Sequence, residues 1–391
     1  MAVIDLTPSY SHGLWILSLT LIVYILNLAI HRLLFSALAR FPGPRLWALT
    51  RLPYVISLLR GNLAQDIRQI HEEYGDAVRV APNEVSFATP DAWRDVHTTR
   101  SCQRPFPKNP LWYQPPPGQV FSLPTTPNYT DHARMRGLLK GAFTERALQD
   151  QESVIQSYVD LLISSLHDKA SSGVSVDMVD WFNYTTFDIV GDLGFGEPFD
   201  CLGNSAYHPW VSMIFDSLRV YVLAAATRYY PLVEIILMRL VPKKVRENAQ
   251  DHHQLSVDKV YRRLNLEKQR HDFMTPIIEL NTDMQIMSLA EIESTFSLLV
   301  VAGSETTATT LSGITNHLIQ NPSVMQSLVS EIRGAFKAEK DITMESLRHL
   351  PYLGAVISEG LRICNPIPMG LPRLVPTGGD TVCGHWLPGN V

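Results

Sequence analysis

The sequence holds few cysteines and no excess of positive charge. Its 391 residues include only four cysteines, which are far apart and show the spacing of neither a zinc site nor a redox motif: Cys102, Cys201, Cys364 and Cys383. We therefore expect reduced thiols in a reducing compartment. The net charge of -5 also lacks the basic footprint of a nucleic-acid-binding protein. These absences leave a globular chain of one large or two medium domains, without internal repeats or low-complexity segments.

A second absence concerns charge near the N-terminus. No Asp, Glu, Lys or Arg occurs between Asp5 and Arg32, and residues 14–30 are almost entirely apolar. As a helix this stretch rises about 26 Å, which approaches the ~30 Å hydrocarbon core of a bilayer once residues 31–34 are added. We predict a transmembrane anchor over residues 14–34, with residues 1–13 as a lumenal N-terminus.

A cleaved signal peptide and a buried core helix are the alternatives for this segment. A signal peptide has a positive segment before a shorter apolar core, whereas the flank here carries Asp5 and no Lys or Arg. A core helix is not expected because the stretch is N-terminal and apolar all round. Positive charge follows the segment, at Arg32, Arg40, Arg45 and Arg51. That asymmetry predicts that the body of the protein lies in the cytoplasm.

The remaining pattern predicts a mainly α-helical domain over residues 51–391 with a small β-sheet. Phe41-Pro42-Gly43-Pro44 predicts a stiff elbow within residues 35–50, because two prolines around a glycine cannot continue a helix. Alternating apolar and polar residues predict a hairpin over 76–90, and Gly and Pro turns predict short strands over 371–391. Eight prolines within residues 101–128 predict a long irregular loop.

Helical patterns fill most of the chain between these strands. They cover residues 64–74, 131–147, 150–170, 177–193, 207–240, 243–270, 322–338 and 351–364. Residues 228–241 are notably apolar, which fits either core or a second surface that touches the membrane. Ser288 and Glu291 form a capping-box pattern, so we predict that the longest helix starts there and ends at Asn321-Pro322.

The middle of this longest helix carries residues that a buried helix does not favour. Gly303 costs up to about 1 kcal/mol relative to alanine and each threonine costs some tenths, while a carboxyl in apolar surroundings needs a partner or a shifted pKa. Thr306 can donate to the carbonyl of Ala302, and Gly303 lets a flat or bulky ligand approach. With Glu305, this set suits proton delivery to a ligand. Alternatively, the hydroxyls only bond within the helix and Glu305 forms a salt bridge.

Three motifs together resemble the cytochrome P450 superfamily of haem-thiolate monooxygenases. Ala302-Gly303-Ser304-Glu305-Thr306-Thr307 resembles its oxygen-binding motif. Ser358-Glu359-Gly360-Leu361-Arg362 resembles its Glu-x-x-Arg helix, and Asp131-His132-Ala133-Arg134-Met135-Arg136 its propionate-binding helix. The fungal membrane-bound branch is also similar in its anchor, elbow and early hairpin. The resemblance covers residues 14–391 in family order, and it implies a P450-like fold with an N-terminal transmembrane helix.

The resemblance implies a role for each matching residue. Glu305 and Thr306 would be the catalytic pair that relays protons to bound dioxygen. Glu359 and Arg362 share a helix face in an apolar run, so we expect a buried structural pair. The proline-rich loop would line the substrate pocket. The residues expected to contact haem, several of them otherwise solvent-facing cations, are His132, Arg136, Ala302, Gly303 and Arg373.

The family's iron ligand has no counterpart among these residues. That ligand is a cysteine in a Phe-x-x-Gly-x-Arg-x-Cys-x-Gly loop, and none of the four cysteines has this context. We therefore assign no metal ligand, and we expect the C-terminal haem-ligand segment to be missing after Val391. Three interpretations follow. The chain is an enzyme of this family whose gene model is cut short by a missed exon or a frameshift, or it is a truncated and inactive product. Alternatively, it is a membrane-anchored binding partner without catalysis.

The intact family member would insert one oxygen atom from O2 into an apolar small molecule. The resemblance implies haem as cofactor and electrons from NADPH through a membrane-bound cytochrome P450 reductase. We expect a single-pass protein of the endoplasmic reticulum membrane with a cytoplasmic catalytic domain. A fungal secondary metabolite, such as a terpenoid or polyketide, is the expected substrate, and no nucleic acid is expected as a partner.

Overall fold

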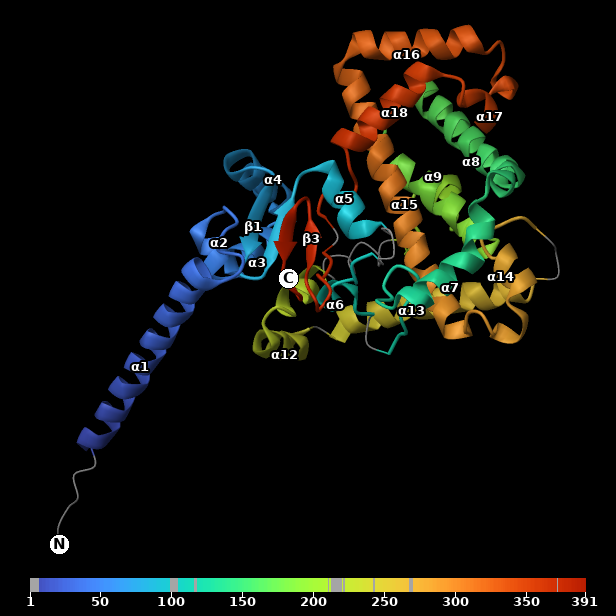
Figure 1. Ribbon diagram of the computed structural model, residues 1–391. Helices are drawn as coiled ribbons and strands as arrows, with labels where there is room; N and C mark the ends of the chain where they lie inside the picture. Colours follow the sequence, from blue (N-terminus) through green and yellow to red (C-terminus); the bar gives the residue numbers. More distant parts are fainter. Residues whose placement is uncertain are drawn as a thin grey trace. The chain divides into compact units, whose positions relative to one another are not determined.

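The computed structural model describes residues 7–98, 105–115, 118–209, 211, 220, 222–241, 243–266, 270–370 and 372–391. These residues form two compact units, each built from segments that are distant in the sequence (Figure 1). The N-terminal unit combines Met1–Asn109, Val222–Pro231 and Leu371–Val391, and the helical unit combines Pro110–Tyr221 and Leu232–Gly370. The mainly helical fold with small sheets is confirmed, whereas the predicted boundaries at residues 13, 34 and 50 stay predictions.

Some predicted features fall partly outside the described residues. They are the lumenal N-terminus, the loop at 101–128, the helical patterns at 207–240 and 243–270, and Leu371.

The N-terminal unit holds the apolar segment, several short helices and both hairpins. Its elements are α1 Thr7–Ile30, a π-helical turn His31–Phe35, α2 Arg45–Leu49, α3 Leu52–Leu59, α4 Leu63–Tyr74, β1 Ala77–Ala81, β2 Glu84–Phe87, α5 Pro90–His97, β3 Asp380–Val382 and β4 His385–Leu387. Helix α4 confirms the helix predicted at 64–74, and the two antiparallel hairpins β1–β2 and β3–β4 confirm the predicted strands.

Helix α1 is exposed along most of its length. Its large side chains are exposed, from Leu14 at 65% to Ile30 at 51%. Residues Gly13–Phe35 form a candidate membrane span of 23 residues with a mean hydropathy of 2.2. Figure 1 shows α1 extending as one rod from the rest of its unit. The prediction of a long apolar N-terminal helix is confirmed, and it is long enough to cross a bilayer by length and composition.

The predicted elbow is fastened to the first hairpin. The backbone N–H of Arg79 on β1 donates to Pro42 O at 2.8 Å. Gly43 has φ +155°, and a Cβ there would lie 2.5 Å from Arg79 O. Only glycine allows this close approach of the two backbones. The segment after α1 is therefore held directly against β1.

The helical unit surrounds one long central helix. Its elements are α6 Pro110–Tyr113, α7 Tyr129–Leu139, α8 Glu145–Ser171, α9 Met178–Phe195, α10 Cys201–Asn204, α12 Pro231–Leu240, α13 Lys243–Leu264, α14 Thr275–Leu280, α15 Leu289–Gln320, α16 Pro322–Ala335, α17 Met344–Leu347 and α18 Pro351–Ile363, with 3₁₀ turns at Lys140–Phe143, Thr282–Met284 and Glu339–Asp341.

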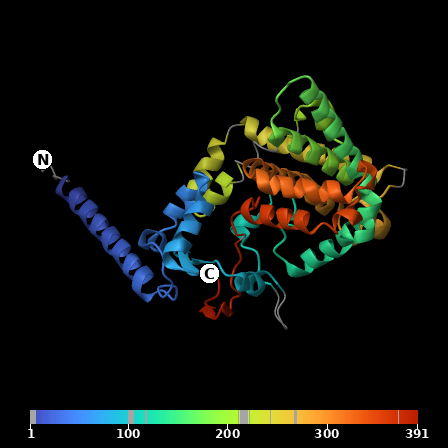
Figure 2. The same cartoon turned by 90° about the horizontal axis from the view of Figure 1, so that it is seen from above.

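Helix α15 has the predicted start, length and end. It spans 32 residues from a complete Ser288–Glu291 capping box to Asn321. Figures 1 and 2 show α9 and α18 packed beside it. Phe187 and Phe195 of α9 and Phe296 of α15 lie in one buried core. This packing buries the first half of α15 and fixes the direction in which its middle residues point.

Two predicted helices are interrupted. The pattern at 131–147 divides because Thr144 leaves the helix and caps α8, accepting a hydrogen bond from Ala147 N at 3.3 Å. The pattern at 207–240 is broken by a turn after Thr227, where Tyr230 N donates to Thr227 O at 2.8 Å. Pro231 has no N–H to donate, so it begins the new helix α12.

Candidate active site

The predicted acid–alcohol pair lies halfway along α15. Thr306 Oγ1 donates to Ala302 O at 2.7 Å, as the sequence predicted. Thr307 and Ser304 donate in the same way to the carbonyls four residues before them, at 3.1 and 2.5 Å. The helix stays continuous through these bonds. Because the Thr306 proton is already used, the lone pairs of its oxygen remain available to accept a proton from another donor.

Glu305 is the unusual carboxyl of this helix. Its Oε1 atom is buried and has no hydrogen-bond partner among the described residues. The alternative in which Glu305 forms a salt bridge is therefore not found in the described part of the chain. Burial raises the pKa of Glu305 to about 7. A carboxyl that titrates near neutral pH can both give and take a proton under physiological conditions.

Gly303 and Ala302 differ in their surroundings. A Cβ on Gly303 would lie 3.0 Å from Val190 Cγ2 on α9, so the missing side chain lets α9 approach α15. Ala302 is exposed on the same helix. The structure thus gives Gly303 a packing role, and Ala302 presents the small free surface. A contact of either residue with a cofactor stays a prediction.

His132 and Arg136 lie on α7. They are four residues apart, so they share one face of the helix. His132 is half-buried, whereas Arg136 is exposed and has no side-chain partner among the described residues. The N-terminus of α7 is capped by Asn128, whose Oδ1 accepts from Thr130 N at 2.9 Å. The cap orders the turn that carries His132, and Arg136 is free to meet an anion.

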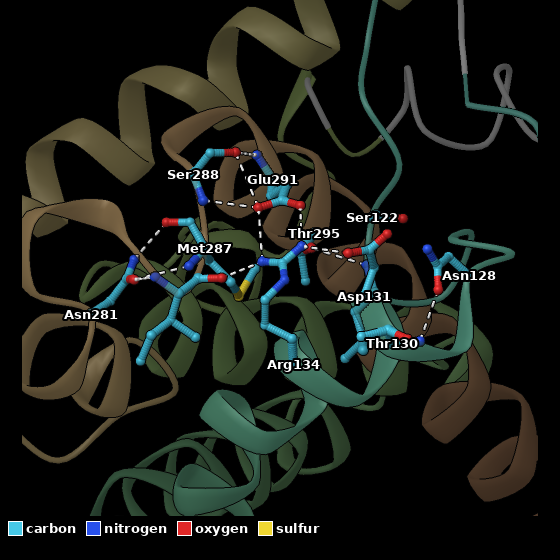
Figure 3. Close-up of polar contacts among 12 residues, drawn as sticks. Ser122, Asn128, Thr130, Asp131, Arg134, Asn281, Met287, Ser288, Glu291 and Thr295 are labelled. Carbon is cyan, nitrogen blue, oxygen red and sulfur yellow. Dashed lines mark hydrogen bonds and ion pairs between the residues drawn. The ribbon is translucent and has the colours of Figure 1, made fainter.

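Sequence reasoning missed the residue that ties α7 to α15. Arg134 Nη2 lies 2.7 Å from Glu291 Oε1 and 3.3 Å from Asp131 Oδ1, and its Nη1 donates to Ile286 O (Figure 3). Glu291 also accepts from Ser288 N at 2.8 Å. The same carboxylate therefore caps α15 and pairs with α7.

Asn281 completes this junction. Its side chain donates to Met287 O at 2.7 Å and accepts from Ile286 N at 2.8 Å (Figure 3). These bonds hold the loop just before α15. The signal available in the sequence was the capping Glu291, because a carboxylate has two oxygens and capping can leave one for a cation.

Arg373 belongs to the other unit. It pairs with Lys108 in an isolated antiparallel bridge, and its Nη1 donates to Phe106 O at 3.2 Å. Burial, together with the charge of Arg373, lowers the pKa of Lys108 to about 8 and that of His97 to about 4. His97 is therefore neutral at pH 7. The predicted propionate contacts are divided between the units, with Arg373 in one and both α7 residues in the other.

The pair Glu359–Arg362 is formed, but its predicted burial is wrong. Arg362 Nη2 lies 2.6 Å from Glu359 Oε1, and Arg362 Nε donates to Glu359 Oε2 at 2.7 Å. Their side chains are 56% and 69% exposed. The apolar run around them does not bury the pair because the described residues leave this side of α18 uncovered, including Ile357 and Leu361.

The described cysteines are engaged elsewhere. Cys201 is fully buried, and burial raises the pKa of its thiol to about 11. Cys383 Sγ lies 3.2 Å from Thr89 Oγ1. Cys364 packs against α15, where a Cβ on Gly313 would lie 2.4 Å from its sulfur. Cys102 lies outside the described residues. Within the described ranges, no three His, Cys, Asp or Glu residues gather into a metal site.

Comparison with known proteins identifies the family. Residues 41–388 match the family Cytochrome P450. The chain is 40% identical to the cytochrome P450 monooxygenase lcsI of Purpureocillium lilacinum, in an alignment that covers 94% of this chain and 72% of that protein. It is 42% identical to the cytochrome P450 monooxygenase astJ of Aspergillus oryzae, with 93% and 72% covered.

A third relative has a name that specifies its reaction. The chain is 37% identical to averantin hydroxylase of Aspergillus parasiticus, with 98% of this chain and 76% of that protein covered. The match over residues 41–388 includes α7, the centre of α15 and α18, which hold the residues described above. The chain therefore belongs to the cytochrome P450 family of oxidoreductases, and its fungal relatives are monooxygenases.

Proposed function

We propose that this protein is a monooxygenase that inserts one oxygen atom from O2 into an apolar small molecule of fungal secondary metabolism. The observation that carries the proposal is the Glu305–Thr306 pair in the middle of α15. One oxygen of Glu305 is buried without a partner among the described residues, and the Thr306 hydroxyl donates its hydrogen bond to Ala302 O. A helix that needed only stability would not keep an unpartnered buried carboxyl.

The described residues fit a haem group. A haem is flat and apolar with two anionic propionates, so it needs small residues on one face and cations at its edge. Ala302 offers an exposed small side chain on the same helix as Glu305, and Arg136 is an exposed cation without a partner in the described part of the chain. We infer that His132 and Arg136 of α7 contact a propionate, whereas the role of Arg373 stays a prediction of the family resemblance. When bound, haem supplies the iron at which dioxygen is activated.

The protein's own contribution is proton delivery. With its pKa raised to about 7, Glu305 carries a proton on part of the molecules at neutral pH and can replace it after donation. Thr306 Oγ1 stays fixed by its bond to Ala302 O, so it presents its lone pairs in one direction. In this proposal Glu305 supplies the proton, and the fixed Thr306 hydroxyl accepts a hydrogen bond that directs the proton's path.

We propose that the iron ligand lies beyond Val391. The relatives are aligned over only 72% of their length, and no described cysteine has the required surroundings. Exposed apolar side chains on α15 and α18 support a covering segment, namely Leu311 at 37%, Ile357 at 44% and Leu361 at 50%. If no such segment exists, the alternative is an inactive chain that acts at most as a membrane-anchored binding partner.

We propose further that α1 anchors the protein in the endoplasmic reticulum membrane, with both units in the cytoplasm. The exposed apolar surface of α1 and the arginines after it support this orientation. A cytochrome P450 reductase in the same membrane would then pass electrons from NADPH.

The substrate class is tested with the protein expressed from its complete transcript and loaded with haem. A panel of terpenoids and polyketides is titrated while the haem absorbance is followed, with polar sugars of similar size as controls. We expect saturable absorbance shifts for a subset of the apolar compounds. Shifts from neither class, or equal shifts from the sugars, would contradict the proposed substrate class.

A further inference from the structure

A groove at the C-terminal end of α1 is lined by both apolar and basic residues. It has a volume of about 540 Å³. Its apolar lining includes Leu26 and Ile30 of α1, Leu33 of the following turn and Phe41, and its basic lining residues are Arg45 and Arg79. All of these residues belong to the N-terminal unit. We call this cavity the foot groove.

Arg79 is the unusual residue of the foot groove. Its side chain is only 2% exposed, and its Nε atom is buried without a hydrogen-bond partner. Its other nitrogens donate to neutral acceptors, namely Arg32 O at 2.7 Å, Pro82 O at 2.7 Å and Ser36 Oγ at 3.4 Å. Burial and the charge of Arg32 lower its pKa. A buried guanidinium normally has an anionic partner.

No carboxylate of the described residues supplies that partner. Arg32 donates to Leu49 O at 2.5 Å, and Arg45 is exposed at the first position of α2. Within the described ranges, no ion pair is formed by Arg32, Arg45 or Arg79. Three arginines therefore gather at the foot of α1 without negative charge to balance them, although many exposed arginines elsewhere in the chain are paired.

The position of the foot groove favours a lipid over a soluble anion. Two of its apolar lining residues belong to the exposed surface of α1, where Leu26 is 56% and Ile30 51% exposed. It lies at the C-terminal end of the candidate span Gly13–Phe35, which is the level of the phosphate groups if α1 crosses the bilayer. The cytoplasmic leaflet carries the anionic lipids, and basic pockets beside membrane helices bind their head groups.

We propose that the foot groove binds one anionic glycerophospholipid of the cytoplasmic leaflet. Its phosphate lies against Arg45 and Arg79, and one acyl chain lies along Leu26 and Ile30. The proposal rests on the proposed membrane anchoring of α1. The bound lipid would neutralise the buried arginine and fix the angle between α1 and the hairpin β1–β2, because Arg79 is itself a residue of β1.

The test uses the full chain, purified from membranes in mild detergent, and native mass spectrometry of the lipids it retains. Phosphatidylserine and phosphatidylcholine are offered in equal amounts. We expect one retained phosphatidylserine on the wild type and about fivefold weaker retention on Arg45→Gln, the effect of one basic residue near an anionic lipid. Arg45→Gln should fold, because a cation at a helix N-terminus is unfavourable. Arg60→Gln, an exposed arginine at the end of α3, is the matched control.

Three results would overturn the proposal. Equal retention of the two lipids would remove the anion preference, and equal effects of Arg45→Gln and Arg60→Gln would remove the site. Complete displacement of phosphatidylserine by inorganic phosphate would show that the acyl chain contributes nothing. An alkaline carbonate wash separates the underlying anchoring proposal: release of the protein contradicts anchoring, whereas a retained protein without lipid preference contradicts the lipid site alone.

Discussion

Glu305 is a carboxylic acid that the surrounding helices partly bury without giving one of its oxygens a partner. Its pKa rises from 4.5 to about 7 because burial disfavours the charged form. In the unfolded chain the group ionises near its ordinary value. The folded state therefore holds more protons than the unfolded state between pH 4.5 and 7, and the free energy of unfolding falls as pH rises through this window.

Glu305→Gln should remove this pH dependence. We expect the variant to gain stability relative to the wild type between pH 4.5 and 7, by about 1 kcal/mol after allowance for solvent screening. Urea denaturation of the full chain in detergent, followed by circular dichroism at pH 5 and pH 8, measures the change. Glu339→Gln, at an exposed position, is the control. A constant difference between Glu305→Gln and wild type across this range would contradict the raised pKa.

Thr306→Ala tests the alcohol of the pair. Removing the hydroxyl leaves α15 intact, because alanine is the better helix former by some tenths of a kcal/mol. In the haem-loaded protein from the complete transcript, with a substrate from the panel, we expect NADPH consumption to continue while product per NADPH falls at least several-fold. Thr306→Ser keeps the hydroxyl and should keep most of the coupling. Wild-type coupling in Thr306→Ala would exclude a role for Thr306 in proton delivery.

For single residues, the sequence predicted hydrogen bonds and ion pairs within one helix better than it predicted burial. The bond from Thr306 to Ala302 O follows from a spacing of four residues in one helix, so the sequence contains all the information needed. The pairing of Glu359 with Arg362 follows in the same way. Their exposure depends on which distant segments cover α18, and local sequence does not encode that.

Between elements, close helix contacts depend on glycines of α15 and α18. A Cβ on Gly360 of α18 would lie 2.2 Å from Ile314 Cγ1 and 2.5 Å from its Cδ1 on α15, but 3.6 Å from its Cβ. Truncation of Ile314 therefore removes the clash. The Glu-x-x-Arg segment is thus placed by the glycine between its two charged residues as well as by their ion pair.

The effect of Gly360→Ala on the free energy of unfolding should have opposite signs in the wild type and in the Ile314→Ala variant. In the wild type, overpacking costs about 1–3 kcal/mol, which exceeds the gain of up to about 1 kcal/mol in helix propensity. In Ile314→Ala the clash is gone, so Gly360→Ala should stabilise by up to about 1 kcal/mol. A cycle of the four proteins in urea measures the coupling. If Gly360→Ala has the same effect in both backgrounds, the two helices do not meet at this glycine.

The junction of α7 and α15 rests on Arg134. Its ion pair with Glu291 is partly buried, with side chains 30% and 19% exposed. We expect Arg134→Met to lower the free energy of unfolding by about 2 kcal/mol at pH 7, between the values of exposed and buried pairs. Arg136→Met, on the same helix but exposed, should change it by less than about 0.5 kcal/mol.

At acidic pH, Arg134→Met should lower the free energy of unfolding much less than it does at pH 7. Burial opposes ionisation of Glu291, but hydrogen bonds from Arg134 and Ser288 lower its pKa below the usual value. The stability from the pair is present above the unfolded pKa of 4.5 and is lost as pH falls through the lower folded pKa. Denaturation series at pH 7 and pH 3 measure this. An equal loss at both values would mean that Arg134 acts through packing rather than charge.

The bounds of a helix could be predicted where residues next to its ends cap it or break it. The Ser288–Glu291 cap and Asn321-Pro322 define both ends of α15 in the sequence. The link from Arg134 to Glu291 was not predicted because it joins positions 157 residues apart.

Across the whole molecule, the division into two units was beyond sequence reasoning. Residues 222–231 and the C-terminal tail join the N-terminal unit through contacts with distant segments. Arg51, for example, lies 4.3 Å from the centroid of the Tyr229 ring and 2.5 Å from Glu84. Such contacts combine positions that no local pattern connects. The family motifs were recognisable because each is short and local.

We propose that this chain provides the proton-delivering and haem-holding residues of a thiolate-ligated monooxygenase. The most direct test is the carbon monoxide difference spectrum of the reduced protein, expressed with haem available from the complete transcript, wherever that transcript ends. We predict the absorbance signature of thiolate-ligated haem. A protein that folds but binds no haem, or that gives the spectrum of haem without a thiolate ligand, would contradict the proposed function.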